Sequence, residues 1–231
     1  MPTIRKFPLV TEEVYHVFNR SIARYKIFSS RRDFERMIEL FGYYQWKNRE
    51  MKFSQWKRKK NKESLSLGVM DSAKLVNIIA YCIMPTHIHL ILKQLKDRGI
   101  STFMSQIANS YSRYFNVKYK RKGPLWEKEF SNVLVDTDEQ LLHLTRYIHL
   151  NPATSNLTDA PENWFASSYK EYLEEADDDR KLCNFADILD ISPDSYKKFV
   201  NDRIDYQREL SRIKHLLLEP PPYHLPGGTG E

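Results

Sequence analysis

The sequence has 231 residues, a formal net charge of +6 and 41% hydrophobic residues, which suffices for one domain with a packed core. No apolar run reaches the roughly 18 residues that span a bilayer, and the two cysteines, Cys82 and Cys183, form no CxxC motif. These features exclude a membrane-spanning protein, a disulfide scaffold and a cysteine-based zinc protein. They are typical of a protein of a reducing cytoplasm.

Charge is distributed unevenly along the chain. Residues 1–70 carry 16 Lys and Arg against 7 Asp and Glu, whereas residues 136–190 carry 4 against 13. Tyrosine and tryptophan lie among the basic residues, and this mixture favours a polyanion partner whose bases stack on the rings. Charge alone does not distinguish DNA from RNA or from a membrane surface.

Four segments have the alternation or the apolar content of β-strands: residues 14–22, 76–83, 87–94 and 131–135. Pro85 and Thr86 provide the turn of a hairpin between the second and third segments. The second segment is almost wholly apolar, which predicts a central position in the sheet.

Three segments repeat apolar residues at helical spacing: residues 31–50, 100–119 and 138–150. The last is expected to stop at Pro152, because the residue before a proline disfavours helix. Residues 54–75 break the periodicity and are interpreted as a flexible loop with a basic run.

The C-terminal part of the chain differs in composition from the rest. Residues 182–218 contain short helical stripes, whereas the last residues are rich in proline and glycine. We therefore divide the chain into a domain of residues 1–175, a helical appendage of residues 176–218 and a disordered tail of residues 219–231.

The third strand carries two histidines, His87 and His89, separated by one hydrophobic residue. Residues two apart on a strand point to the same side, about 6–7 Å apart, so the two imidazoles form half of a metal site. Taken alone, such a pair is more often an ordinary polar surface. The third predicted helix favours a metal site over this interpretation, because its residues Tyr147 and Asn151 lie one turn apart on one face.

Together these segments make the chain resemble the REP-associated tyrosine transposases, of the single-strand branch of the HUH (His-hydrophobic-His) endonucleases. The matching segments occur in the family's order over about residues 10–175: Tyr15-His16-Val17-Phe18-Asn19-Arg20, Met84-Pro85-Thr86-His87-Ile88-His89-Leu90, Gly123-Pro124-Leu125-Trp126, Tyr147-Ile148-His149-Leu150-Asn151-Pro152, and Trp164 with Ser167-Ser168-Tyr169. Two positions depart from the pattern: Thr86, where the family more often has asparagine, and Glu129, where a basic residue is usual.

The resemblance implies an α+β fold, a ferredoxin-like antiparallel sheet with helices packed on one face. A helix bearing the tyrosine and the small helical C-terminal appendage follow this sheet. It further implies a nickase and strand transferase for single-stranded, hairpin-forming repeat DNA, in which Tyr147 forms a 5′-phosphotyrosine. His87, His89 and Asn151 are then the ligands of a divalent metal ion, Mg²⁺ or Mn²⁺, of which Mn²⁺ matches imidazole better.

Further expectations concern partners. We expect a homodimer in the bacterial cytoplasm, associated with the nucleoid when bound to DNA, and no membrane partner. The expected DNA contacts are Asn19, Arg20, Lys57, Arg58, Lys59, Lys60, Arg113, Lys120, Arg121 and Lys122.

Several alternatives stay open at this point. The chain could be a domesticated relative that binds structured nucleic acid without cutting it. A histidine-metal hydrolase of a small substrate fits less well, because no carboxylate accompanies the histidines in a recognisable motif. Tyr111 and Tyr114 compete for the role of nucleophile, although their apolar stripe predicts that they are packed. His143, one turn before Tyr147, could assist it, although a plain surface histidine is the commoner case.

Overall fold

The structure is a computed structural model that describes residues 8–47, 49, 51–63, 73–177 and 181–203. Its centre is an antiparallel four-stranded sheet in the order β2-β3-β1-β4. The strands are β1 (Val14–Arg20), β2 (Val76–Met84), β3 (His87–Gln94) and β4 (Ser131–Leu134). The chain order β-α-β-β-α-β around this sheet is ferredoxin-like, and the predicted α+β fold is confirmed.

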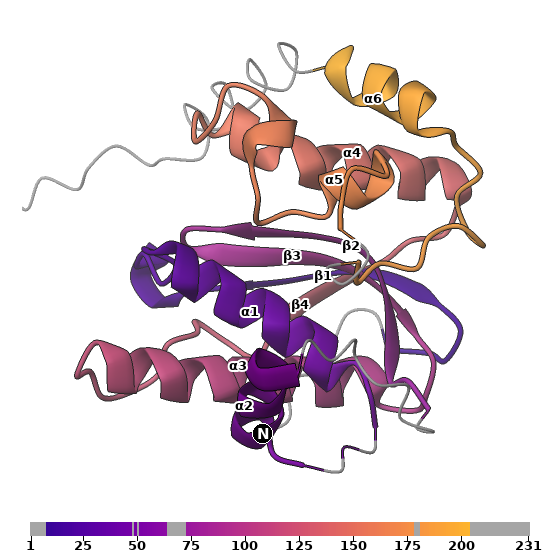
Figure 1. The fold of residues 1–231 in the computed structure, drawn as a ribbon. Helices are drawn as coiled ribbons and strands as arrows, with labels where there is room; N and C mark the ends of the chain where they lie inside the picture. The colour runs from indigo at the N-terminus through magenta and orange to yellow at the C-terminus, as the bar shows by residue number, and fades with distance from the viewer. Residues whose placement is uncertain (1–7, 48, 50, 64–72, 178–180, 204–231) are drawn as a thin grey trace, which may run out of the picture.

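Helices cover both faces of the sheet (Figure 1). One layer contains α1 (Arg31–Tyr44), α2 (Phe53–Glu63) and α3 (Gly99–Lys118). The opposite layer contains α4 (Asp138–Thr154), α5 (Tyr169–Tyr172) and α6 (Pro193–Asn201). Two short 3₁₀ turns, η1 (Ile22–Arg24) and η2 (Pro161–Asn163), lie in the connections. In the described part of the chain, none of these helices has the length and apolar character needed to cross a bilayer.

The side chains of β1, β2 and β3 contribute to two hydrophobic cores because they alternate between the faces of the sheet. Val17 and Leu90 point into the core under α1 and α3, whereas Ile91 and Ile79 point into the core under α4. The α6 side chains Tyr196 and Val200 belong to that second core, which includes Ile148 of α4. The expected division at residue 175 stays a prediction, and the expected tail at 219–231 lies outside the described residues.

Three expectations about the elements need correction. The segment that we interpreted as a loop begins with α2, because lysine, arginine, glutamine and glutamate favour helix even without an apolar stripe. Two aromatic residues, Phe53 and Trp56, anchor this helix against Tyr43. Residues 64–72 of that segment lie outside the described residues.

The helix α4 continues past Pro152 to Thr154. A proline in the last turn removes only one backbone donor, and the Ser155 N–H still donates to the Asn151 carbonyl at 3.0 Å. The prediction that the helix stops at Pro152 is therefore wrong.

Strand β2 lies at the end of the sheet and not in its centre. Its outer edge is nevertheless covered, because the Ile83 N–H donates to the Ala166 carbonyl at 2.9 Å and the Ser168 N–H donates to the Tyr81 carbonyl at 3.0 Å. This cover accounts for an apolar strand at the edge of the sheet.

The layer of α1 and α3 is joined by a buried carboxylate, Asp33. It accepts hydrogen bonds from the Ser30 N–H at 2.9 Å, from the Tyr114 and Tyr119 hydroxyls, and from the Lys118 ammonium at 2.7 Å. Burial alone would raise the pKa of Asp33, but these hydrogen bonds outweigh it and lower the pKa to about 2. One carboxylate therefore caps α1 and ties it to the C-terminal end of α3.

We expect Asp33→Asn to lower the free energy of unfolding by about 2 kcal/mol at pH 7. Because the pKa of Asp33 is lowered on folding, its contribution is present above pH 4 and is lost as the pH falls towards 2. Urea unfolding of Asp33→Asn and wild type at pH 7 and pH 2.5 measures this, with exposed Asp187→Asn as control. An equal difference at both pH values would contradict the assignment.

Candidate functional site

The two histidines of β3 lie on the sheet face that α4 covers. In the register of β1 and β3, Arg20 is paired with His87 and Phe18 with His89. The hairpin turn before them is fixed by backbone hydrogen bonds, from the Ser21 N–H to the Thr86 carbonyl at 2.9 Å and from the Ile27 N–H to the Pro85 carbonyl at 2.9 Å. The rings of His87 and His89 are 4.9 Å apart, as expected for one strand face.

Each of the two imidazoles has its Nδ1 atom engaged within the protein. The Nδ1 of His87 lies 2.9 Å from the Thr86 hydroxyl, and the Nδ1 of His89 lies 3.0 Å from Nε2 of His16 on β1. If both Nδ1 atoms carry the proton and donate it, both Nε2 atoms are free to accept a cation. Thr86, which departs from the family pattern, thus takes part in orienting His87.

All three histidines are neutral at pH 7. Burial lowers the pKa of His16 to about 4, and burial together with Arg20 and Arg24 lowers the pKa of His87 to about 4. Burial, His87, His16 and Arg20 lower the pKa of His89 well below its ordinary value. A neutral imidazole is the form that binds a metal ion.

Tyr147 of α4 lies against this histidine pair. Its ring centroid is 6.1 Å from that of His89 in an edge-to-face arrangement, and the side chain is 39% exposed. Burial raises the pKa of Tyr147, whereas a hydrogen bond with Asn151 and the charge of Arg20 lower it. A partly exposed tyrosine is thus held next to the imidazole of His89.

The position of α4 depends on a buried hydrogen-bond network around His149. Its ring nitrogens lie 2.7 Å from the Tyr196 hydroxyl and 2.8 Å from the Ser168 hydroxyl. The Ser168 oxygen also accepts a hydrogen bond from the Tyr81 N–H of β2 at 2.9 Å. Burial lowers the pKa of His149 to about 3, so this link is neutral. The sequence resemblance includes His149 and Ser168, and the structure assigns them to positioning α4.

A divalent metal ion fits the residues at this site. His87 and His89 offer two nitrogen ligands, and the buried side-chain nitrogen of Asn151 has no hydrogen-bond partner in the described part of the chain. Rotation of this amide would present its oxygen instead, which is a ligand suited to Mg²⁺ or Mn²⁺. Among the described residues no three His, Cys, Asp or Glu side chains form a metal cluster, so water or phosphate would have to complete the shell.

Sequence reasoning missed two residues of the site, His16 and Arg24. His16 was named only as part of the matching segment Tyr15–Arg20, and its contact with His89 depends on the register of β1 and β3. Arg24 lies in η1, where Ala23 and Arg24 have positive φ angles of 50° and 54°. Arg20 and Arg24 make the surroundings of His87 electropositive, which suits a phosphate.

The structure does not support the predicted DNA contact of Asn19. Its side chain is 2% exposed and lies on the other face of β1 from His16. It donates a hydrogen bond to the Glu129 carbonyl at 2.6 Å and accepts one from the Arg20 N–H at 2.9 Å. Asn19 therefore fixes the chain beside β1.

Arg20, also predicted to contact DNA, lies beside His87 and Tyr147. The remaining predicted DNA contacts lie in the α1–α3 layer and not beside Tyr147. Lys57 forms an ion pair with Glu39 at 2.5 Å, and Arg121 donates to the Pro124 carbonyl at 2.8 Å. The exposed cations of this group are Arg58, Lys59, Arg113, Lys120 and Lys122. The side chain of Lys60 lies outside the described residues.

The rival tyrosines lie on the far side of the sheet from the histidine pair. Tyr111 is fully buried and donates to the Ile27 carbonyl at 2.7 Å, and Tyr114 donates to Asp33 at 2.9 Å. Burial raises the pKa of both phenols. His143 contacts Arg146 and the ring of Phe199, so α6 is its neighbour. Only Tyr147 among these tyrosines lies at the histidine pair.

Comparison with known proteins agrees with this arrangement. Residues 44–151 match the model of a family described as "Transposase IS200 like". A curated relative from Haemophilus influenzae has the name "Putative REP-associated tyrosine transposase". It is 26% identical to this chain over 102 residues. This match covers 39% of the chain and 57% of the relative, so the chain spans only about half of that protein's length.

A solved REP-associated tyrosine transposase bound to a REP hairpin has the same fold. The two structures agree with a TM-score of 0.50 at 14% identity, over 84% of this chain and 96% of the other. The predicted resemblance to REP-associated tyrosine transposases is confirmed. The family match ends at residue 151, within α4, and therefore includes both the histidine pair and Tyr147.

We expect His16→Phe to lower the affinity for Mn²⁺ about 10- to 100-fold, because the partner that orients His89 is lost while a ring of similar size is kept. Isothermal titration with Mn²⁺ alone measures this. The surface variant His143→Gln serves as control. Equal Mn²⁺ affinity of His16→Phe and wild type would contradict the orienting role.

Proposed function

We propose that the chain is a metal-dependent nickase and strand transferase for single-stranded, hairpin-forming repeat DNA. The observation that carries this proposal is the contact of Tyr147 with His89, 6.1 Å between ring centroids, on an accessible face of the sheet. A nucleophile beside two neutral imidazoles is the arrangement that a tyrosine-dependent nuclease needs. The similarity to transposases supports the same conclusion.

In the proposed reaction the Tyr147 oxygen attacks the phosphorus of one phosphodiester. The bond from phosphorus to the 3′-oxygen breaks, the leaving oxygen takes up a proton, and the phenol proton is lost to solvent. The products are a 5′-phosphotyrosine and a free 3′-hydroxyl. Because the covalent link keeps the energy of the broken bond, attack by a 3′-hydroxyl can rejoin strands without ATP.

The residues around Tyr147 have separate roles in this proposal. Arg20 and Arg24 attract the phosphate, and Arg20 also favours the phenolate of Tyr147. His87, His89 and Asn151 would hold the Mg²⁺ or Mn²⁺ ion. When bound, this ion neutralises the charge of the scissile phosphate and stabilises the transition state.

Hairpin DNA is the proposed substrate because the solved relative is described as bound to a REP hairpin. Single-stranded DNA suits a site on a sheet face, since no duplex has to be opened and the unpaired bases are free to stack on aromatic side chains. We also propose that the chain acts as a homodimer. Sedimentation at micromolar concentration tests this, and a fully active monomer would contradict it.

Cleavage of a hairpin oligonucleotide with and without Mn²⁺ tests the proposed reaction. We expect wild type to nick only with the metal, and His87→Ala/His89→Ala to lose nicking while it still binds the hairpin, because phosphate contacts elsewhere supply affinity. His143→Gln is the matched control.

Two results of this assay would contradict the proposal. Binding of the wild type without nicking under any metal would favour the domesticated, non-cleaving protein. Full nicking by the double variant would exclude the histidine pair as the metal site.

A further inference from the structure

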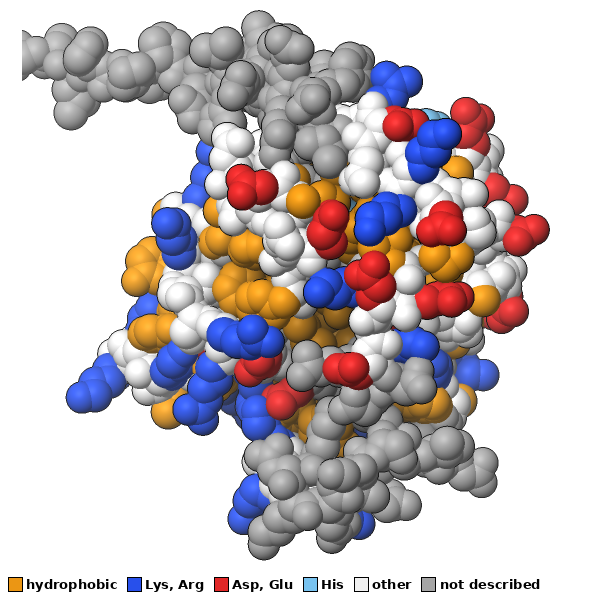
Figure 2. Space-filling view, turned by 45° about the horizontal axis from the view of Figure 1, so that its top comes forward, with side chains coloured by type: hydrophobic (Ala, Val, Ile, Leu, Met, Phe, Trp, Pro, Cys, Tyr) orange, Lys and Arg blue, Asp and Glu red, His pale blue; other side chains and the backbone are white. Residues whose placement is uncertain are grey.

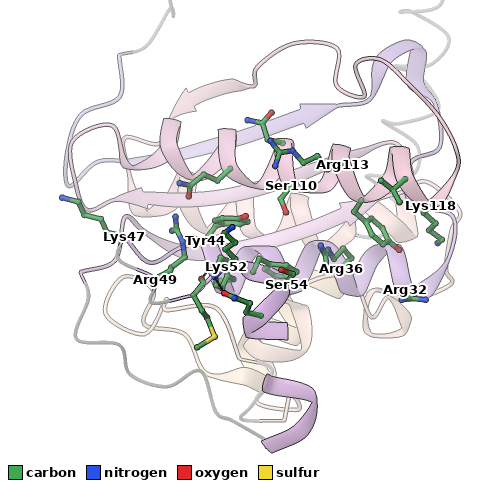
Figure 3. A pocket seen from close by; sticks show the side chains of 18 residues that line it. Arg32, Arg36, Tyr44, Lys47, Arg49, Lys52, Ser54, Ser110, Arg113 and Lys118 are labelled. Carbon is green, nitrogen blue, oxygen red and sulfur yellow. Dashed lines mark hydrogen bonds between the residues drawn. The ribbon is translucent and has the colours of Figure 1, made fainter. Parts of the chain in front are cut away.

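A large basic pocket lies on the α1–α3 layer (Figure 3). This layer covers the face of the sheet opposite to the one that α4 covers (Figure 1). Its volume is about 1340 Å³, and its walls are α1, α3, Lys47, Arg49 and residues 51–55. We call it the basic pocket. Of the lining residues only Arg113 is among the predicted DNA contacts, because residues far apart in the chain form the pocket.

The lining of the basic pocket is strongly cationic. Its described lining contains no Asp or Glu, and its cations are Arg32, Arg36, Lys47, Arg49, Lys52, Arg113 and Lys118. Within the described residues, ion pairing engages Lys118 alone of this set, with Asp33 at 2.7 Å. In Figure 3 the labelled cations lie around the pocket on several sides, which suits a large anion better than a single small ion.

Two arginines of the basic pocket are held in place by aromatic rings. Arg36 lies over Phe53 at 4.2 Å and over Tyr114 at 5.1 Å, measured from the guanidinium carbon to the ring centroid. Arg49 lies over Tyr44 at 5.0 Å in the same way. Stacking of this kind fixes the direction of a guanidinium group before a ligand arrives.

Arg36 has a further property that points to an anion. Its Nε atom is buried without a hydrogen-bond partner among the described residues, and burial lowers the pKa of its guanidinium group. An unpaired buried donor is costly, and a phosphate oxygen would satisfy it. Neutral polar side chains of α3, among them Asn109 and Ser110, complete the lining with further hydrogen-bonding groups.

The stacking of arginines on these rings indicates whether the pocket suits single-stranded or double-stranded DNA as its ligand. Proteins that bind single strands offer open aromatic faces to the bases, but here guanidinium groups cover the rings of Phe53, Tyr44 and Tyr114. In a duplex the bases are paired and the phosphates face outwards, so a surface of cations suffices. The basic pocket therefore matches duplex DNA and not unpaired bases.

We propose that the basic pocket is a second DNA site, which binds the phosphate backbone of double-stranded DNA independently of sequence. This proposal rests on the proposed function in so far as DNA is taken as the polyanion. The two sites would bind different parts of the DNA, because the sheet separates the basic pocket from the histidine pair. A duplex segment is held on the α1–α3 layer while a single strand reaches Tyr147.

The test compares a random-sequence 16-base-pair duplex with a short single-stranded oligonucleotide that carries the cleavage site. The variant Arg32→Gln/Lys47→Gln/Lys52→Gln removes three exposed cations of the pocket, and Lys96→Gln/Lys170→Gln/Lys198→Gln removes three exposed cations elsewhere. Duplex affinity is measured for the full chain by fluorescence anisotropy at several salt concentrations. Thermal unfolding checks that both variants are folded.

We expect the pocket variant to lose at least tenfold in duplex affinity, with a salt slope lower by about 2 to 3, because each lost phosphate contact removes about 0.9. Its covalent adduct on the short oligonucleotide should form as in wild type, and the control variant should change neither. Unchanged duplex binding of the pocket variant, or an equal loss in the control, would overturn the proposal.

Two further outcomes separate this inference from the proposed function. Loss of the adduct on the short oligonucleotide in the pocket variant would mean that the pocket is not a separate site. Strong duplex binding by a wild type that never forms an adduct would leave the pocket supported and contradict the nickase.

Discussion

The arrangement of the site depends on how one helix is fixed to the sheet. His149 is fully buried in α4 and joins the Tyr196 hydroxyl to the Ser168 hydroxyl, which in turn binds the backbone of β2. Because these groups are neutral and each has a partner, the network avoids the cost of buried unpaired polar groups. It determines which face of α4 points towards the strands, and therefore that Tyr147, two residues before His149, lies against His89.

The two helical layers of the protein differ in the sign of their charged side chains. Lysine and arginine are concentrated in residues 1–70, which include α1 and α2 of one layer, whereas acidic residues are concentrated in residues 136–190, which include α4 and α5 of the opposite layer. In Figure 2 red acidic side chains gather on the right of the molecule, and blue basic side chains gather at its lower left. A polyanion is thus attracted to one layer, and Arg20 and Arg24 supply positive charge beside the histidine pair.

The features of the fold and the site that could be predicted are those that depend on residues close together in the chain. The hairpin, the histidine face and the turn that joins Tyr147 to Asn151 follow from spacing along one strand or one helix, and they were predicted. The contact of His16 with His89, the burial of Asn19 and the edge position of β2 depend on pairing between distant segments, which a single sequence does not specify. Helix α2 was missed because its signal is helix propensity without an apolar stripe.

The central claim is that α4 presents Tyr147, and no other tyrosine, to a phosphodiester at the histidine pair. The most direct measurement is mapping of the residue that becomes linked to DNA. After incubation with an end-labelled hairpin and Mn²⁺, denatured protein is digested and the labelled peptide is identified by mass spectrometry. The account predicts an adduct on Tyr147 that disappears in Tyr147→Phe while hairpin binding persists. An adduct on Tyr111 or Tyr114, or one that survives in Tyr147→Phe, would contradict it.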